Sequence, residues 1–424
     1  MNLAPSNNNH ETSVTLVKQA LGASKNSDFQ KKTLVWISSL VLDVYLHKTS
    51  RIEILSQLAK RGWNVYLVGT RSRNRVQFQS SGIRTVAVPS RDRPPISTAV
   101  YNLALLFFLP FYVTRIRPDF VVLEPNEHFF SFLPTRLLCR FRGVKTVLDI
   151  RSVPVTRDTQ GSRGFRKMFV FDACMCIAKK SFDGITTITL SMKNDICKGF
   201  AIDRRQVGVW SSGASPTVFA PEKYIDDASK LKSTLGLSGK FVIFYHGVLS
   251  SKRGLEESID AVSMARKENP EIVLFILGNG STAGSLRTLV KSRMVQENVV
   301  IHDGVDYSEV PKYIAMCDVG IVPLPDLPYW RSQCPLNLLE YLAMKKPVIV
   351  SDIPANREIV GNGRFALYIS SSKPEEIARA LTSAYLNREE LKRAGESARN
   401  VVTQKYNWKI AAESLASYLL SIDA

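Results

Sequence analysis

The sequence predicts an α/β protein of two domains, each built on a doubly wound parallel sheet. Its 424 residues are enough for about two domains with separate cores. Short apolar runs alternate along it with helical patterns, which is typical of βαβ units. The alternation begins at Leu34 and begins again at Lys240, so we expect two Rossmann-like domains. The predicted divisions are a disordered extension at 1–32, a first domain at 33–215, a linker at 216–239, a second domain at 240–405 and a terminal helix at 406–424.

The first domain opens with a clear βαβ pattern. Leu34–Ser38 is predicted as a strand, Ile52–Lys60 as a helix and Val65–Val68 as the next strand. The preceding residues 1–32 are polar and contain no apolar run of the secretory type, so we expect a cytoplasmic protein. The six cysteines and five histidines form no disulfide or zinc spacing, and no bound metal is expected.

The most apolar window of the chain is Ala99–Val113, which reads AVYNLALLFFLPFYV. It is shorter than the roughly 20 residues that span a bilayer, and it contains Asn102 and Pro110. We prefer a helix buried against the sheet. The alternative is an interfacial helix that lies on a membrane.

Positive charge is concentrated in the first half. The formal net charge is +18, and residues 1–215 hold 31 Lys and Arg against 14 Asp and Glu, a net +17. Such an excess favours an anionic partner, and no nucleic-acid-binding motif accompanies it. We therefore expect an anionic membrane surface, although a basic surface that serves only solubility stays open. The predicted lipid contacts are Arg91, Arg93, Arg115, Arg117, Arg136, Arg140 and Arg142.

Polar residues follow two predicted strands of the first domain. Phe120–Leu123 leads into a turn with Glu124 and His128, and Thr146–Ile150 leads into Arg151. Ligands in open α/β sheets gather at the carboxyl ends of the strands. These two turns, with Asp149 near the end of the second strand, are therefore candidate ligand contacts.

The stretch CPLNLLEYLAMKKPVIVSD predicts a ligand-binding helix between two strands of the second domain. Pro335 suits the first helical turn, and the free N–H groups of Leu336 and Asn337 would face an anion. Glu340 lies one turn further in, where a carboxylate can bind two adjacent ribose hydroxyls. Lys345 and Lys346 are expected to close the helix. The alternative is an ordinary amphipathic helix whose glutamate offsets the helix dipole.

Two glycine turns of the second domain suggest further contacts. Gly247 and the cations Lys252 and Arg253 follow the strand Phe241–Tyr245, and they suit a diphosphate, although an ordinary basic surface turn remains possible. The turn Gly278–Asn279–Gly280 follows the strand Ile272–Leu277 but has imperfect dinucleotide-binding spacing.

These motifs together resemble glycosyltransferase family 4, which has the GT-B fold. In CPLNLLEYLAMKKPVIVSD, Glu340 matches the second glutamate of the family's Glu-x7-Glu pattern, and the first position is held by Ser332. Gly247 and the Arg253–Gly254 step match the family's phosphate turn, in which Val248 replaces an arginine. Three further matches are the Gly278–Gly280 turn, Val305 in the segment whose backbone reads the base, and Trp408–Leu420, which resembles the helix that crosses back to the first domain.

The resemblance implies a retaining sugar transfer from a nucleotide diphosphate sugar, which is a co-substrate, with neither metal nor other cofactor. Arg253, Lys252 and the amides of Leu336 and Asn337 would stabilise the departing diphosphate, and Glu340 would bind the donor ribose. Glu124, His128, Asp149 and Arg151 would face a glycan or lipid-linked acceptor. A nucleotide-sugar epimerase and a non-catalytic GT-B subunit are the alternatives.

Overall fold

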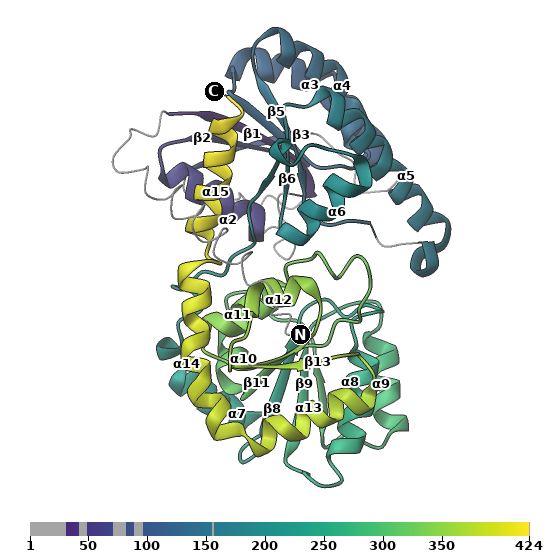
Figure 1. Cartoon of the computed structure of the whole chain (residues 1–424), viewed down its shortest axis with the longest axis vertical. Coiled ribbons are helices and arrows are strands. Elements are labelled where there is room, and N and C mark those ends of the chain that lie inside the picture. Colours follow the sequence, from purple (N-terminus) through teal and green to yellow (C-terminus); the bar gives the residue numbers. More distant parts are fainter. Residues whose placement is uncertain (1–30, 42–48, 71–81, 89–95, 155–156, 424) are drawn as a thin grey trace, which may run out of the picture.

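The computed structural model describes residues 31–41, 49–70, 82–88, 96–154 and 157–423. Two α/β domains lie one above the other along the long axis (Figure 1), each around a parallel sheet. The two-domain α/β prediction is therefore confirmed. The predicted disordered extension falls almost wholly outside the described residues.

The first domain contains a seven-stranded parallel sheet in the order β3-β2-β1-β4-β5-β6-β7. Its central strand β4 (Phe120–Leu123) is the run FVVL, buried along its whole length, as expected where helices cover both faces of a sheet. The direction of winding reverses between β1 and β4, which is where such sheets bind ligands. The other strands are β1 Thr33–Val41, β2 Asn64–Thr70, β3 Ile83–Val88, β5 Lys145–Ile150, β6 Gly184–Thr187 and β7 Val207–Val209.

Helices cover both faces of this sheet. α2 (Thr49–Lys60) shares one core with the C-terminal helix α15 (Trp408–Ser421). The opposite face is covered by α3 (Ile96–Ile116), α4 (His128–Phe141), α5 (Arg157–Ser181) and α6 (Leu190–Phe200).

The second domain repeats this plan with six parallel strands in the order β10-β9-β8-β11-β12-β13. The strands are β8 Phe241–His246, β9 Ile272–Leu277, β10 Val299–His302, β11 Val319–Val322, β12 Val348–Ser351 and β13 Ala366–Ile369. The helices are α7 Ile225–Thr234, α8 Leu255–Ala265, α9 Ala283–Ser292, α10 Val310–Met316, α11 Leu336–Ala343, α12 Pro354–Val360, α13 Pro374–Leu386 and α14 Arg388–Gln404.

Two details of the second domain refine the predictions. The segment 216–239, predicted as a linker, contains α7, which packs against α10. Lys345 and Lys346 close α11 through their backbone, since Lys345 N donates to Leu342 O at 3.1 Å and Lys346 N donates to Tyr341 O at 2.9 Å. Lys345 has a left-handed φ of 59°, and Lys346 Nζ donates to the carbonyls of Ala315 (2.8 Å) and Cys317 (2.6 Å).

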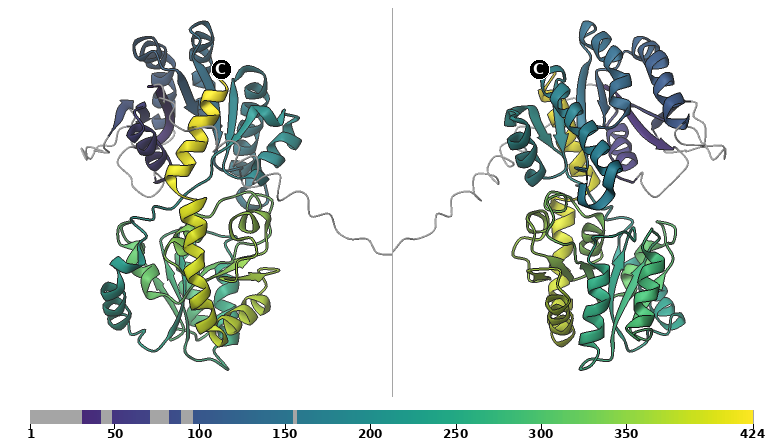
Figure 2. Two further views of the ribbon diagram at one scale, coloured as in Figure 1. Left: turned by 60° about the vertical axis from the view of Figure 1, so that its left-hand side comes forward. Right: turned by 90° about the vertical axis from the view of Figure 1, so that its right-hand side faces the viewer.

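The C-terminal helix α15 returns to the first domain after α14 has crossed the second (Figure 2). Tyr418 fixes it there, since its hydroxyl accepts from Ile185 N at 3.1 Å and donates to Gln206 O at 2.6 Å. Gly208 of β7 is required beneath this ring, because a Cβ at Gly208 would lie 2.5 Å from Tyr418 Cγ. The two domains therefore share an element as well as a connecting chain.

Helix α3 is longer than predicted and has two apolar faces. One face packs on the sheet through Tyr101, Leu105, Leu109 and Val113, so the preferred prediction of a buried helix holds for this face. The other face carries exposed large apolar side chains. Within the described ranges, α3 alone is long and apolar enough to cross a membrane by length and composition. Its exposed residues are Leu103, Phe107, Phe108 and Phe111.

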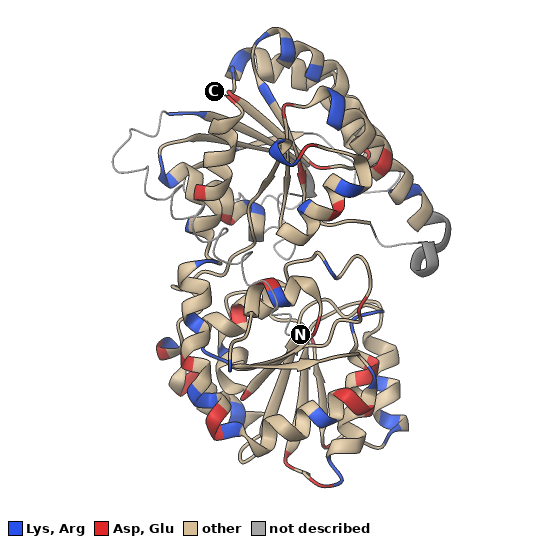
Figure 3. Ribbon diagram, in the orientation of Figure 1, with Lys and Arg blue, Asp and Glu red and all other residues tan. Residues whose placement is uncertain are grey.

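The arginines predicted to contact lipid divide into three groups. Arg115, Arg117, Arg140 and Arg142 are exposed. Figure 3 shows that α3 and α4 carry Lys or Arg but no Asp or Glu. Arg136 is a correction, because it is 9% exposed, donates to Ser181 O and lies 3.4 Å from Asp183. Arg91 and Arg93 lie outside the described residues.

Candidate functional site

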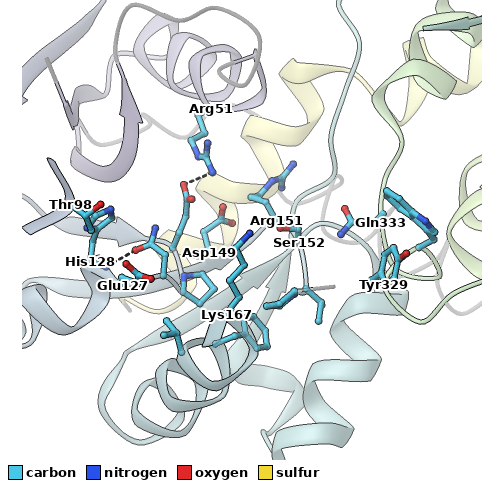
Figure 4. Close-up of a pocket in the computed structure, with 18 of the residues that line it drawn as sticks. Arg51, Thr98, Glu127, His128, Asp149, Arg151, Ser152, Lys167, Tyr329 and Gln333 are labelled. Atoms are coloured by element: carbon cyan, nitrogen blue, oxygen red, sulfur yellow. Dashed lines mark hydrogen bonds and ion pairs between the residues drawn. The ribbon is translucent and has the colours of Figure 1, made fainter. Parts of the chain in front are cut away.

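A cavity of about 610 Å³ lies between the two domains (Figure 4). The first domain contributes the carboxyl ends of β4 and β5 and the starts of α3 and α4. The second contributes the turn before α8 and the loop before α11. The lining residues are Arg51, Thr98, Glu124, Pro125, Asn126, Glu127, His128, Asp149, Arg151, Ser152, Val153, Pro154, Lys167, Val170, Phe171, Arg253, Tyr329, Trp330 and Gln333.

All four residues predicted on the acceptor side line this cavity. Glu124 follows β4 and forms a 2.5 Å ion pair with Arg51 near the start of α2. Burial raises the pKa of Glu124, and Arg51 opposes that rise. The pair therefore places a cation and a carboxylate together on the wall formed by the first domain.

Asp149 is fully buried beneath the cavity. Its Oδ1 accepts from Thr186 Oγ1 at 2.7 Å and from Trp210 Nε1 at 2.9 Å, whereas Oδ2 has no hydrogen-bond partner among the described residues. Burial raises the pKa of Asp149, and the positive charge of Arg151 lowers it. One carboxylate oxygen thus fixes Trp210 while the other remains available.

Arg151 is held against the same tryptophan. Its guanidinium lies 3.6 Å from the centre of the Trp210 ring and donates to Trp210 O (3.1 Å) and Ser212 Oγ (2.9 Å). Burial lowers the pKa of Arg151 to about 10, so it remains a cation at neutral pH. Stacking and two hydrogen bonds fix this positive charge at the cavity wall.

His128 is the first residue of α4 and presents a neutral ring to the cavity. Its Nδ1 lies 2.6 Å from Asn102 Oδ1, and the ring packs edge-on against Tyr101 with centroids 4.6 Å apart. Because an amide oxygen only accepts, Nδ1 carries the proton and Nε2 the lone pair. Burial lowers the pKa of His128 to about 4. The ring can therefore accept a hydrogen bond from a hydroxyl at neutral pH.

The second domain contributes Arg253 to the opposite wall. Arg253 Nε donates to Ser250 Oγ at 3.0 Å, and the guanidinium lies 5.0 Å from the Trp330 ring centre. Trp330 Nε1 donates to Lys252 O at 2.8 Å, which joins this turn to the loop before α11. The side chain of Lys252 is exposed and does not line the cavity. Of the two predicted cations, the structure places only Arg253 there.

Glu340 is 2% exposed and also does not line the cavity. Tyr307 donates its hydroxyl proton to Glu340 Oε1 at 2.7 Å. His246 Nε2 lies 3.1 Å from Oε2, but it is not aligned for a hydrogen bond. A carboxylate has about four acceptor positions, so Glu340 could accept further hydrogen bonds. Because the side chain is buried, ribose binding would require local opening, and it stays a prediction.

The helix α11 begins as predicted. Pro335 occupies the N-cap position with an extended backbone, so Leu336 and Asn337 open the helix. Asn337 Nδ2 donates to His246 O at 3.2 Å, and its Oδ1 accepts from Leu338 N at 3.0 Å. The Asn337 side chain thus links α11 to the end of β8.

The predicted glycine turns pack against each other. A Cβ at Gly278 would lie 1.9 Å from Gly247 O, and a Cβ at Gly280 would lie 1.9 Å from Leu249 O. Asn279 O accepts from Leu249 N at 2.9 Å, and its Oδ1 accepts from Gly304 N at 3.2 Å, next to the half-buried Val305. Close loop packing therefore accounts for these glycines, and their contact with a donor stays a prediction.

Sequence analysis missed several cavity residues. Arg51 lies in the first turn of α2, just before the predicted helix Ile52–Lys60, and Lys167 lies in α5. Hydrophobic periodicity gives no signal for such cations. The loop before α11 adds Tyr329, Trp330 and Gln333, directly upstream of the recognised motif. The neighbouring Ser332 is 1% exposed, and its carbonyl accepts from Thr189 Oγ1 at 2.8 Å.

No metal centre is assigned. Within the ranges that the structure describes, no group of three or more His, Cys, Asp or Glu side chains could hold a metal ion. The predicted metal independence stays a prediction.

Two family models match the chain, one on each domain. The model described as Glycosyltransferase Family 4 matches residues 49–218, and the model described as Glycosyl transferases group 1 matches residues 227–401. Together they cover both walls of the cavity.

The chain is similar to two named transferases at low identity. It is 21% identical over 188 residues to the alpha-D-kanosaminyltransferase of Streptomyces kanamyceticus (44% of this chain, 47% of that protein). It is 25% identical over 178 residues to the GDP-mannose-dependent alpha-(1-6)-phosphatidylinositol monomannoside mannosyltransferase of Mycobacterium tuberculosis (42% of this chain, 46% of that protein). The chain thus spans about half the length of these relatives.

The fold matches solved glycosyltransferase structures along nearly the whole chain. Anabaena HepE in complex with UDP-glucose superposes with a TM-score of 0.72 and 13% identity, covering 92% of this chain and 100% of that one. This similarity establishes the two-domain GT-B fold.

Proposed function

Because the chain belongs to the GT-B glycosyltransferases of the family 4 and group 1 type, we propose that it transfers a sugar from a nucleotide diphosphate sugar to an acceptor, with retention of anomeric configuration. The observation that carries this proposal is the cavity between the domains. It brings Arg253 of the second domain opposite His128 and Arg151 of the first. Donor and acceptor would meet there.

The cavity walls suit the charge changes of the reaction. A departing nucleoside diphosphate gains negative charge, and fixed cations stabilise such charge in a site shielded from water. Arg253, positioned by Ser250 and Trp330, supplies the cation on the donor side. His128 Nε2 supplies an acceptor for a hydroxyl proton on the other side. Glu340 would bind the donor ribose after Tyr307 has moved.

The acceptor is proposed to be a glycan or a lipid-linked sugar at the cytoplasmic face of a membrane. One similar protein is named for a phosphatidylinositol monomannoside acceptor, which is lipid-linked. The basic and apolar surface of α3 and α4 gives separate support for a membrane-borne acceptor.

Donor binding is tested first by thermal shift of the whole chain with UDP-, GDP- and ADP-sugars. We expect one nucleotide to raise the melting temperature, since a ligand at 100 times its Kd adds about 2.7 kcal/mol of stability. Proton NMR of the product formed from that donor then reports the anomeric configuration. An inverted product would contradict retention, and the absence of any response would contradict donor binding.

A non-catalytic GT-B subunit is the second candidate, because of Ser332. Where the family pattern has a glutamate, this residue is buried and its carbonyl is bonded to Thr189. Such a subunit would bind the nucleotide sugar without turnover. Slow hydrolysis of the donor, abolished by Arg253→Ala, would favour the enzyme, whereas tight donor binding with no hydrolysis or transfer would favour the subunit.

A further inference from the structure

Helices α3 and α4 together form an exposed apolar surface, which we name the α3–α4 face. The two helices pack against each other on one side of the first sheet. Phe107 is 67% exposed and Phe141 is 80% exposed. Single exposed apolar residues are ordinary, but a contiguous group marks an interaction site. The members are Leu103, Phe107, Phe108 and Phe111 of α3, with Phe130, Leu137 and Phe141 of α4.

The charges at this face have one sign. Neither helix contains Asp or Glu. Arg115 and Arg117 lie at the end of α3, and Arg140 and Arg142 lie at the end of α4. All four are exposed. An apolar surface with four exposed arginines at one end is complementary to an anionic lipid surface, which offers both an apolar interior and negative headgroups.

Helix α3 lies on the domain and cannot span a bilayer in this position. Its inner face, with Tyr101, Leu105, Leu109 and Val113, is packed on the sheet at 1% exposure each. Only the outer face is free to meet lipid. The surface therefore matches a helix lying in the interface plane.

The direction of the helices relates this surface to the cavity. Each connects two parallel strands, so α3 and α4 run in the same direction. Thr98, near the start of α3, and His128, the start of α4, both line the cavity. Arg115 lies about 26 Å from Thr98 along the axis of α3, at a rise of 1.5 Å per residue. The α3–α4 face thus extends from the cavity edge to the arginines.

We propose that the α3–α4 face docks the protein on an anionic membrane and holds the starts of α3 and α4, with the cavity, at the lipid surface. The purpose of the docking, access to a lipid-linked acceptor, rests on the proposed function. Docking itself requires neither donor nor turnover.

The test is co-sedimentation of the full chain with vesicles of phosphatidylglycerol and phosphatidylcholine, compared with phosphatidylcholine alone. We expect sedimentation with the anionic vesicles. Phe107→Ser with Phe111→Ser should reduce partition at least about tenfold, because two exposed aromatic rings no longer enter the interface. The matched control is Leu386→Ser, which removes a side chain that is also 67% exposed, in the second domain. This control should sediment like the unaltered chain.

A second pair of variants tests the charge. Arg140→Ala with Arg142→Ala should reduce partition by about tenfold at low salt, and high salt should remove the difference. Lys267→Ala with Lys291→Ala, which removes two exposed lysines of the second domain, should have no such effect.

Three results would overturn the proposal. They are no sedimentation of the unaltered chain with anionic vesicles, unchanged sedimentation of the Phe107/Phe111 variant, and a dimer in solution that this variant converts to monomers. The last result would identify the face as a contact between two copies. An unchanged melting temperature and unchanged thermal shift with the donor nucleotide would show that the variants fold. Failure of donor binding in the unaltered chain contradicts the proposed function and leaves docking intact.

Discussion

Glu358 of α12 accepts a hydrogen bond from the backbone N–H of Leu190, at the start of α6, over 3.1 Å. Its second oxygen accepts from Ser191 N at 3.4 Å. Because α6 belongs to the first domain and α12 to the second, this carboxylate caps a helix across the domain interface. Burial raises the pKa of Glu358, and the two N–H donors lower it.

Glu358→Ala should weaken the contact between the domains. Loss of a helix cap costs about 0.5–2 kcal/mol, so we expect a fall of a few degrees in melting temperature. Glu358→Gln keeps one acceptor oxygen and should fall less. Equal melting temperatures for the alanine variant and the unaltered chain would show that the contact contributes nothing measurable.

The sequence predicted the fold because its signals are local. The runs FVVL and FVIFY are continuous apolar strands, and Pro335 marks the start of a helix wherever that helix packs. The cavity depends on contacts distant in the sequence. Arg51 meets Glu124, and Trp330 meets Lys252, only after the loops have assembled. Neither hydrophobic periodicity nor motif spacing in the sequence predicts which residues form such pairs.

The exposure of α3 was also beyond the sequence. A helix that is apolar on every side gives no amphipathic signal to separate its buried face from its exposed face. The packing of α3 on the sheet and beside α4 decides which of its faces is covered, and that packing depends on contacts distant in the sequence. The prediction of a buried helix was therefore right for Tyr101 and incomplete for Phe107.

Glu340→Gln should weaken nucleotide binding while leaving the fold intact. The amide oxygen can still accept from Tyr307, so the buried contact of 2.7 Å is retained. A charge-assisted hydrogen bond to the ribose would be lost, at about 1.5–3 kcal/mol, or roughly tenfold or more in Kd. Titration with the nucleotide found by thermal shift measures the change.

Tyr307→Phe is the control for that variant. It removes the hydroxyl that occupies Glu340 Oε1, so it should not weaken binding if the carboxylate must turn to the ribose. Unchanged affinity in Glu340→Gln would remove Glu340 from the donor site.

His128 should make stability dependent on pH. Its folded-state pKa is lowered from 6.5 to about 4, so the unfolded chain binds the proton more readily. The stability contributed by neutral His128 is present above pH 6.5 and is lost as the pH falls toward 4. His128→Asn, which keeps an N–H donor for Asn102, should flatten the fall in melting temperature between those pH values. Identical pH profiles for the variant and the unaltered chain would contradict this assignment.

Arg253→Ala should reduce turnover by roughly two orders of magnitude, as expected when a group that stabilises transition-state charge is removed. Arg253 lines the cavity, whereas the side chain of Lys252 is exposed outside it. Lys252→Ala is therefore the matched control and should keep most of the activity. Because Arg253 also packs near Trp330, Arg253→Lys separates charge from packing: it retains the cation but not the Nε donor to Ser250. Initial rates with saturating donor distinguish the three variants. Equal losses for Lys252→Ala and Arg253→Ala would mean that the turn acts by its shape alone, and a near-normal rate for Arg253→Ala would place the departing diphosphate elsewhere.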